Sequence, residues 1–322
     1  MRVLVTGADG FVGAHATSAF AAAGDEVIRA VGPHGDATGG HPLDVTDEGA
    51  FSALLDGAKP DAILHLAGAS SVAESHRKPA DAARVNTLGV VHLLEATRRS
   101  CPAARVVVVS SGEVYGRVAD DAPATETTPL SAQSPYASSK AAGELFATQF
   151  ARSYGLHVVV ARPFNHIGAG QAPHFVVPSM ASQIARIAAG EAPVLRVGDV
   201  TPVRDFSHVR DVVAGYRLLL TRGAAGEAYN VASGVGRTIA SLLHALAAIA
   251  GVEVRLEVDP ARLRPTEIPT LVGDAKKLRA LGWTPTRSVE DALAEALADA
   301  EQRLASGTSP LPTRLGWVRR AH

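Results

Sequence analysis

The sequence predicts an α/β protein with a doubly wound parallel sheet, followed by a smaller C-terminal α/β region. Short, fully apolar runs rich in β-branched residues alternate with longer Ala-rich amphipathic stretches, the pattern of strands and helices in a sheet covered on both faces. A glycine-rich turn follows the first run. Strands are expected, in order, at residues 3–6, 26–31, 62–68, 105–111 and 157–163.

The predicted helices between these strands include GFVGAHATSAFAAAG, PADAARVNTLGVVHLLEATRRS and YASSKAAGELFATQFARSYG. After about residue 164 the rhythm changes to a helix at 175–190, a strand-like piece around VRDF, the helix HVRDVVAGYRLLLTRG, the strand AYNVAS and the helix TIASLLHALAAIAG. We therefore predict a dinucleotide-binding domain over 1–164, a substrate region over 165–306, with the chain free to cross between the two, and a tail over 307–322.

The composition is that of an ordinary soluble protein. The chain has 322 residues, is 47% hydrophobic and carries 31 basic and 32 acidic residues for a net charge of -1. This balance argues against nucleic-acid and membrane-surface partners. The single cysteine, Cys101, excludes an internal disulfide. With no export signal or membrane-length apolar run recognised, a cytoplasmic protein is expected.

The stretch TGADGFVG places Gly7, Gly10 and Gly13 between the first strand and the first helix. Glycines at this spacing permit a tight turn and a close approach of the backbone to a pyrophosphate, which then faces the helix N-terminus. The position of the motif favours dinucleotide binding over a simple turn.

The second strand and the residues after it read VIRAVGPHG, without the acid that would hold the ribose diol of NAD. NADP(H) is therefore favoured, and NAD stays an alternative. Arg29 and His34 are candidates to meet a 2′-phosphate. Asp44 either holds the adenine amino group or caps a helix.

Ser111, Tyr136 and Lys140 form a candidate catalytic set. Tyr136 and Lys140 are four positions apart, on one face of a predicted helix, and Ser111 follows a strand whose end lies at the ligand-binding edge of the sheet. A phenol with a pKa near ~10 is a poor base, and we expect a neighbouring ammonium and the charge of the nicotinamide to favour the phenolate. The serine then holds the substrate oxygen while the tyrosine moves a proton.

Together these motifs resemble the extended short-chain dehydrogenases/reductases of nucleotide sugars, which have a Rossmann-like fold. TGADGFVG, HLAG, VSSGEVYG, YASSK and RPFNHIGAGQ carry the resemblance to about residue 171, and VRDF, YNVASG and RLRPTE extend it. Within the family the sequence most resembles GDP-4-keto-6-deoxy-mannose reductases. The resemblance implies a homodimer and the following cofactor contacts: Gly7, Gly10, Phe11, Val12, Gly13, Asp44, Val45, Leu66, Ala67, Tyr136 and Lys140.

The same resemblance implies a site for the nucleotide sugar. Its diphosphate would be lined by Asn165, Val177 and Pro178 and bound by Arg204, and Arg264 and Glu267 would hold the nucleoside. Arginine suits phosphate and a carboxylate accepts hydrogen bonds from ribose hydroxyls.

Glu113 is a further candidate catalytic residue. Related dehydratases use a glutamate here to remove a proton from the sugar, but the dTDP-glucose dehydratases have an aspartate beside it where this chain has Gly112. We expect an NADPH-dependent reductase of a GDP-linked 4-keto-6-deoxy sugar. The alternatives are a nucleotide-sugar 4-epimerase with tightly bound NAD, a less favoured 4,6-dehydratase, and a cofactor-sensing protein without catalysis. His65, His166 and His208 fall in different elements, so no metal site is predicted.

Overall fold

The structure is a computed structural model that describes residues 1–33, 39–118, 122–263 and 268–307. The strands are β1 (Arg2–Thr6), β2 (Glu26–Val31), β3 (His41–Pro42), β4 (Ala62–His65), β5 (Arg105–Val109), β6 (Val158–Pro163), β7 (Asn165–Ile167), β8 (Val194–Val197), β9 (Val203–His208), β10 (Ala228–Val231), β11 (Gly236–Thr238), β12 (Arg255–Val258) and β13 (Thr270–Leu271).

The helices alternate with the strands along most of the chain. They are α1 (Phe11–Ala22), α2 (Glu48–Ala58), α3 (Val72–Arg77), α4 (Pro79–Ala83), the π-helix η1 (Arg84–Leu88), α5 (Gly89–Ser100), the 3₁₀ turn η2 (Gly112–Tyr115), α6 (Pro135–Tyr154), α7 (Val176–Ala188), α8 (Val209–Arg222), α9 (Ile239–Ala250), the 3₁₀ turn η3 (Pro260–Arg262), α10 (Lys276–Ala280) and α11 (Val289–Ala305).

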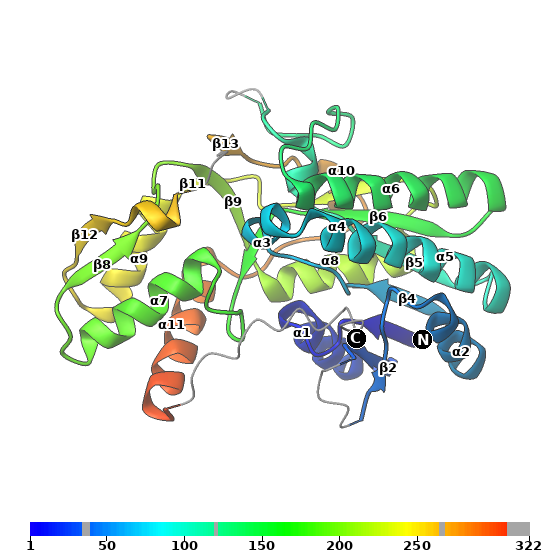
Figure 1. Ribbon diagram of the computed structural model, residues 1–322, viewed down its shortest axis with the longest axis horizontal. Helices are drawn as coiled ribbons and strands as arrows, with labels where there is room; N and C mark the ends of the chain where they lie inside the picture. The colour runs from blue at the N-terminus through cyan, green and yellow to red at the C-terminus, as the bar shows by residue number, and fades with distance from the viewer. Residues whose placement is uncertain (34–38, 119–121, 264–267, 308–322) are drawn as a thin grey trace.

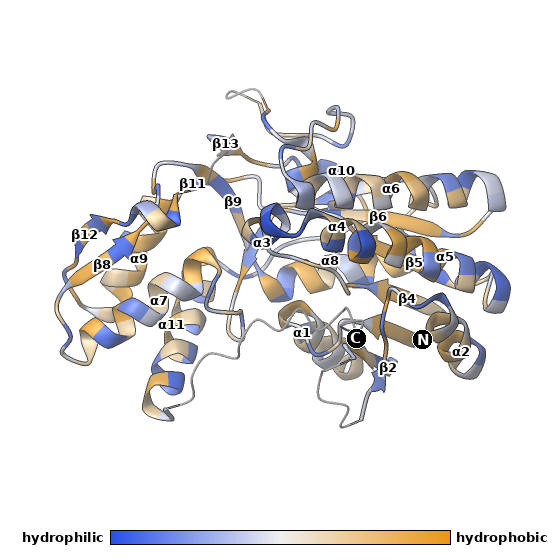
Figure 2. Cartoon of the chain, viewed as in Figure 1, coloured by the Kyte–Doolittle hydropathy of each residue, from blue (hydrophilic) through white to orange (hydrophobic). Residues whose placement is uncertain are grey.

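The large sheet has the strand order β10-β6-β5-β4-β1-β2-β3 among the described residues, with every neighbouring pair parallel. The order reverses at β1, so the carboxyl ends of β1 and β4 meet where ligands bind in this architecture. Central strands such as β4 and β6 are buried throughout, as parallel strands covered on both faces should be. Figure 2 shows their hydrophobic composition. The predicted doubly wound sheet is confirmed.

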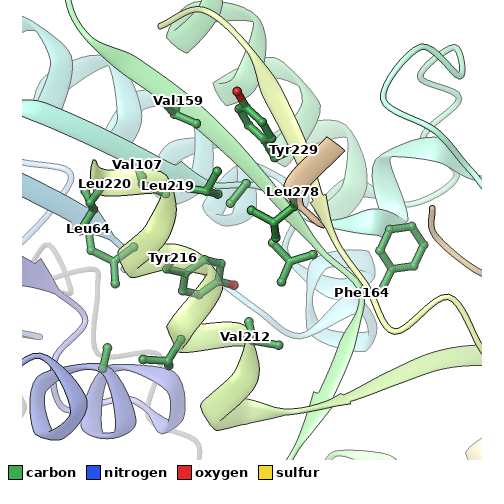
Figure 3. Close-up of a cluster of buried hydrophobic side chains, with 14 of the residues drawn as sticks. Leu64, Val107, Val159, Phe164, Val212, Tyr216, Leu219, Leu220, Tyr229 and Leu278 are labelled. Atoms are coloured by element: carbon green, nitrogen blue, oxygen red, sulfur yellow. The ribbon is translucent and has the colours of Figure 1, made fainter. Parts of the chain in front are cut away.

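Helices cover both faces of this sheet (Figure 1). Helices α1 and α8 pack against each other on one face, and their apolar side chains join those of the strands in one buried cluster. Figure 3 shows part of this cluster, with Tyr216 of α8 among the apolar side chains. Helices α2, α5 and α6 cover the other face with a second cluster. These two layers hold the strand ends, and hence the site, in place.

A smaller region lies to one side, at the left of Figure 1. Strand β9 pairs with β7, β11 and β13, and β8 pairs with β12. Helices α7, α9 and α11 pack together around a third apolar cluster. Strands β7 and β9 of this region contact α8, which packs on the large sheet.

The chain crosses between the two parts more than once. Helix α8 and strand β10 follow β9 in sequence, yet α8 packs on the large sheet and β10 pairs with β6. The division of the chain at residue 164 stays a prediction, as does a separate role for the tail 307–322, which lies outside the described residues beyond Gly307. Among the described residues, no helix is long and apolar enough to cross a membrane.

Candidate active site

The glycine-rich turn lies where β1 meets α1. A Cβ at Gly13 would fall 2.0 Å from the carbonyl oxygen of Gly7, so only glycine lets the helix pack this close to the turn. Gly7 has a φ of 67° and approaches the backbone of Ala67, which follows β4. The N-cap of α1 is Gly10, which has no side-chain cap, so the first-turn amides of Phe11 and Val12 face outward for an anion.

The other predicted cofactor residues follow neighbouring strands at the same edge. Leu66 and Ala67 follow β4, and the amide of Ala67 donates to the hydroxyl of Thr6 at the end of β1, at 3.2 Å. Val45 is fully buried under the turn that carries Asp44. The structure therefore brings these residues to the β1–β4 edge together with the glycine turn.

The side chain of Asp44 accepts hydrogen bonds within the turn that follows β3. Its carboxylate accepts from the amide of Thr46 at 2.9 Å and from the hydroxyl of Thr46 at 2.7 Å. The alternative that Asp44 caps a helix is wrong, because α2 is capped by Asp47, which accepts from Ala50. Binding of adenine by Asp44 stays a prediction.

Tyr136 is the second residue of α6. Ser134 caps this helix and accepts from the amide of Ala137 at 3.1 Å, and Pro135 occupies the first turn, where no amide partner is needed. The amide of Tyr136 donates to the hydroxyl of Ser75 in α3 at 3.0 Å. Lys140 follows one turn later on the same face, so the predicted helical pair is confirmed as a geometry.

Ser111 and Tyr136 meet at the end of β5. Ser111 is buried and hydrogen-bonds to the phenol of Tyr136, and its own hydroxyl accepts from the amide of Glu113 at 3.2 Å. Burial raises the pKa of Tyr136 to about 12, the bond from Ser111 lowers it, and the carboxylate of Glu113 raises it again. Tyr136 is thus a neutral phenol at neutral pH, and Glu113 lies near enough to keep it so.

Lys140 donates from Nζ to the carbonyl oxygen of Val109 at 3.0 Å. Burial lowers the pKa of this ammonium to about 8. The expectation that Lys140 and the charge of the nicotinamide favour the phenolate stays a prediction, and burial is the first cause of the raised pKa of Tyr136.

The sequence reasoning missed Asn86, which lies in the π-helix η1 and is 2% exposed. Its amide nitrogen donates to the carbonyl of Ala69 and to the hydroxyl of Ser139, at 3.0 and 2.9 Å. Its amide oxygen accepts from the amide of Ala69 at 2.8 Å. Asn86 thereby joins the loop after β4 to α6, one residue before Lys140. The π-helix, a frequent mark of functional sites, is visible only in the structure.

The predicted sugar-binding residues come from three elements of the smaller region. Asn165 opens β7 and is in register with Phe206 of β9, two residues from Arg204, so Asn165 and Arg204 lie on adjacent strands. Val177 and Pro178 are buried in the first turn of α7, with Val177 in the apolar cluster. Contact of this turn with a diphosphate would therefore come from backbone amides. Arg264 and Glu267 lie outside the described residues.

Asp205, beside Arg204, organises this side of the site. It is fully buried and accepts from the amide and hydroxyl of Ser233 at 2.8 and 2.6 Å, and from the amides of Gly234 and Gly273 at 2.8 and 3.4 Å. Burial raises its pKa, and these donors oppose the rise. The carboxylate thus fixes two loops against β9 next to the predicted phosphate-binding arginine.

Gly112, beside Glu113, is closely packed. A Cβ on Gly112 would lie 3.1 Å from three atoms of the Phe164 ring, which is itself 4% exposed and stacked on Tyr115. The Phe164 ring would have to shift by a few tenths of an ångström to admit a side chain at position 112. The described residues contain no group of three or more His, Cys, Asp or Glu placed to hold a metal ion.

Comparison with known proteins shows the family of the chain. The family model described as GDP-mannose 4,6 dehydratase matches residues 4–296. The chain belongs to this family. Within the GDP-mannose 4,6 dehydratase family, which is part of the extended short-chain dehydrogenases/reductases, the chain is 40% identical over 306 residues to the GDP-6-deoxy-D-mannose reductase of Pseudomonas aeruginosa, covering 94% of this chain and 98% of the relative.

Solved structures of the extended family are similar over almost the whole chain. The Pseudomonas aeruginosa protein RMD, solved with NADPH, is 38% identical with a TM-score of 0.85, over 94% of this chain and 100% of that chain. The UDP-glucose 4-epimerase of Thermus thermophilus, solved with NAD, is 33% identical with a TM-score of 0.83, over 93% and 99%. The family thus includes members that differ in reaction and cofactor.

Proposed function

We propose that the protein is an NADPH-dependent reductase of a GDP-linked 4-keto-6-deoxy sugar and forms the 4-hydroxy sugar. The observation that carries the proposal is the near full-length similarity, at 40% identity, to the GDP-6-deoxy-D-mannose reductase of Pseudomonas aeruginosa. The meeting of Ser111, Tyr136 and Lys140 at the ligand-binding edge of the sheet supplies the matching chemistry.

The residues present fit a dinucleotide. The turn between Gly7 and Gly13 is a cradle that a single Cβ would fill, and the first-turn amides of α1 face outward for the pyrophosphate. In the Pseudomonas aeruginosa relative this fold holds NADPH. Bound here, NADPH would supply a hydride to C4 of the sugar.

In this assignment Tyr136 is the general acid. Its pKa of about 12 keeps the phenol protonated, as a reduction requires, because the oxygen at C4 gains negative charge and needs a proton. The hydroxyl of Ser111 orients the same oxygen. Lys140, which lies one turn after Tyr136 on α6 and donates to the carbonyl of Val109, would stabilise the negative charge that the phenol gains as it gives up the proton.

We assign the binding of the nucleotide part of the substrate to the smaller region. Asn165, Arg204 and the first turn of α7 take the diphosphate in this proposal, and the segment with Arg264 and Glu267 takes the guanosine. Arg204 is 5% exposed, so its charge would act at short range in a poorly hydrated site. Support for guanine over other bases comes from the relative's substrate.

A 4-epimerase is the second candidate, because the Thermus thermophilus epimerase is similar over almost its whole length and would use the same Ser, Tyr and Lys. A 4,6-dehydratase is disfavoured by the crowded position of Gly112 under Phe164. The two enzyme candidates differ in one measurable respect, since only the reductase consumes reduced cofactor.

We further propose a cytoplasmic homodimer. Leu145 and Phe146 on α6 and Leu88 at the end of η1 are exposed large apolar side chains on adjoining helices, and a second copy of the chain would cover them. Sedimentation of the wild type and of Leu145→Glu tests this: a dimer that dissociates in the variant is expected, and a monomeric wild type would contradict it. The single cysteine suits a reducing compartment.

The function is tested by mixing the purified protein and NADPH with freshly made GDP-4-keto-6-deoxy-mannose and following the absorbance of the reduced nicotinamide. Oxidation that depends on this sugar, and is much slower with the dTDP-linked 4-keto-6-deoxy sugar, is expected. GDP-mannose, which has no keto group, is the matched control. Equal rates with the dTDP-linked sugar would contradict the assignment of GDP as the nucleotide. If no keto sugar causes oxidation of NADPH, the proposal that the protein is a reductase is wrong.

A further inference from the structure

A carboxylate of the glycine-rich turn reaches the end of the second strand. Asp9 lies between Gly7 and Gly10, and its side chain is exposed. Its two carboxylate oxygens share the amide of Gly32, the residue directly after β2, at 3.3 and 3.4 Å. The contact joins two segments that are 23 residues apart in the sequence.

This place in the fold has a defined chemistry. In dinucleotide-binding sheets an acid at the carboxyl end of the second strand accepts a hydrogen bond from the ribose 2′-hydroxyl of NAD, and it disfavours the 2′-phosphate of NADP. The described residues of β2 and the two after it, through Pro33, contain no acid at that end. Asp9 brings a carboxylate to the same backbone position from a different strand end.

We propose that Asp9 sets the balance between NADPH and NADH in this protein, an inference that rests on the cofactor role in the proposed function. Its carboxylate accepts from the 2′-hydroxyl of NADH and repels the 2′-phosphate of NADPH. The preference for NADPH is therefore narrow, and the protein binds both reduced cofactors with dissociation constants within about tenfold of each other, a difference of roughly one hydrogen bond to a charged group.

The competing role for Asp9 is that of a staple, holding the turn to β2 without touching a cofactor. Two substitutions distinguish a purely structural role of Asp9 from a role in cofactor selection. Asp9→Asn keeps an oxygen acceptor for the amide of Gly32 and removes the charge, whereas Asp9→Ala removes both. If the role is purely structural, the contact with Gly32 is preserved in Asp9→Asn and lost in Asp9→Ala. The affinities for NADPH and NADH then change by the same factor.

The test is calorimetric titration of the full-length wild type, Asp9→Asn and Asp9→Ala with NADPH and with NADH, without any sugar. The Kd for NADH divided by the Kd for NADPH should rise about tenfold in Asp9→Asn, the scale of a lost charge interaction at a partly hydrated site. In Asp9→Ala the ratio should also rise, with weaker binding of both cofactors.

A ratio in Asp9→Asn within twofold of the wild-type ratio would overturn the inference, as would a wild type that binds NADPH more than a hundredfold tighter than NADH. Either result leaves the reductase proposal standing, since cofactor still binds. A wild type that binds neither cofactor would overturn both proposals. Binding of both cofactors without reduction of any keto sugar would remove the reductase and leave the role of Asp9 intact.

Discussion

Glu144 of α6 and Arg162 of β6 form an ion pair whose side chains are 5% and 7% exposed. The guanidinium Nε donates to both carboxylate oxygens, at 2.9 and 3.1 Å, and Nη2 also donates to Glu144. The pairing, against the cost of burial, raises the pKa of Arg162 above its ordinary value. The helix that carries Tyr136 and Lys140 is thus fixed to the sheet by a buried charge pair.

The pair extends into a hydrogen-bonded network. Arg162 donates from Nη1 to the hydroxyl of Tyr115 at 2.8 Å, and Tyr115 donates to the side chain of Asn230 at 2.6 Å. The backbone amide of Asn230 donates to the carboxylate of Glu126 at 2.8 Å. The network therefore joins α6, β6 and β10 to the turn that begins at Ser111.

We predict that Glu144→Gln lowers the free energy of unfolding by about 3 kcal/mol, because the guanidinium of Arg162 stays buried without its counter-charge. Urea unfolding of wild type and variant measures this difference. The double variant Glu144→Leu with Arg162→Met is the control, since it removes both charges and should lose less than the single variant. A loss below about 1 kcal/mol in Glu144→Gln would show that the network does not depend on the charge.

Tyr216 offers a stability prediction of opposite sign. Its side chain is fully buried in the cluster of Figure 3, and its hydroxyl has no hydrogen-bond partner among the described residues. Burial raises the pKa of this phenol, so it stays neutral. Tyr216→Phe removes an unsatisfied polar group and should raise the free energy of unfolding by about 1 kcal/mol. A lower melting temperature in the variant would contradict this.

His65 makes stability depend on pH. It is 2% exposed, and its Nδ1 forms a hydrogen bond of 2.9 Å with the hydroxyl of Thr6, which also accepts from the amide of Ala67. Burial, and then the charge of Lys140, lower the pKa of His65 to about 3. The unfolded chain binds this proton near pH ~6.5 and the folded chain does not, so stability is complete above that pH and falls as the pH decreases toward 3.

The loss from His65 should reach roughly 2 kcal/mol at pH 5, from about 1.4 kcal/mol for each unit below pH ~6.5. His65→Asn is the matched variant, because its amide can occupy the place of Nδ1 and does not titrate. Urea unfolding at pH 7, 6 and 5 should show a shallower decline in the variant. Parallel declines in the two proteins would mean that His65 is not the titrating group.

The fold and the positions of Ser111, Tyr136 and Lys140 could be predicted because their signals are local. Each of these signals lies within a short stretch of sequence: the apolar runs that predict the strands, the glycine turn, and the spacing of Tyr136 and Lys140. Contacts across long separations were not. Asn86 bonds to Ser139, 53 residues away, and Ser75 to Tyr136, 61 residues away, and neither polar residue differs in sequence from an ordinary surface one.

The sequence left the chain free to cross between the two parts, but it did not predict that β10 returns to the large sheet or that Asp9 reaches Gly32, for the same reason. The second strand itself carries no acid at its end, and the carboxylate of Asp9 reaches that position from the preceding turn. The raised pKa of Tyr136 also could not be foreseen, since it depends on how deeply the phenol is buried and on Glu113 nearby. Burial and the distance between side chains are properties of the folded chain, and a short sequence motif does not contain them.

We expect Tyr136→Phe to lower kcat at least about 10²-fold, the scale of general acid catalysis, because the phenol is the proton donor to the oxygen at C4. Cofactor affinity should change little. Steady-state kinetics with the GDP-linked keto sugar and calorimetric titration with NADPH measure the two effects. Ser111→Ala is the companion variant and should lower kcat less, since it orients the oxygen but gives up no proton. Turnover near the wild-type rate in Tyr136→Phe would remove the catalytic assignment.

The most direct test of the account follows the hydride itself. A reductase consumes one NADPH per product and leaves the transferred hydride at C4, whereas an epimerase returns the hydride to the sugar and uses its cofactor only catalytically. Incubation of the purified protein with NADPH deuterated at the reactive face of C4 and GDP-4-keto-6-deoxy-mannose should give a product that carries deuterium at C4 of the sugar, detected by mass, with an equal loss of reduced nicotinamide. Interconversion of GDP-sugars without added reductant, and without deuterium in the product, would contradict the reductase and establish the 4-epimerase.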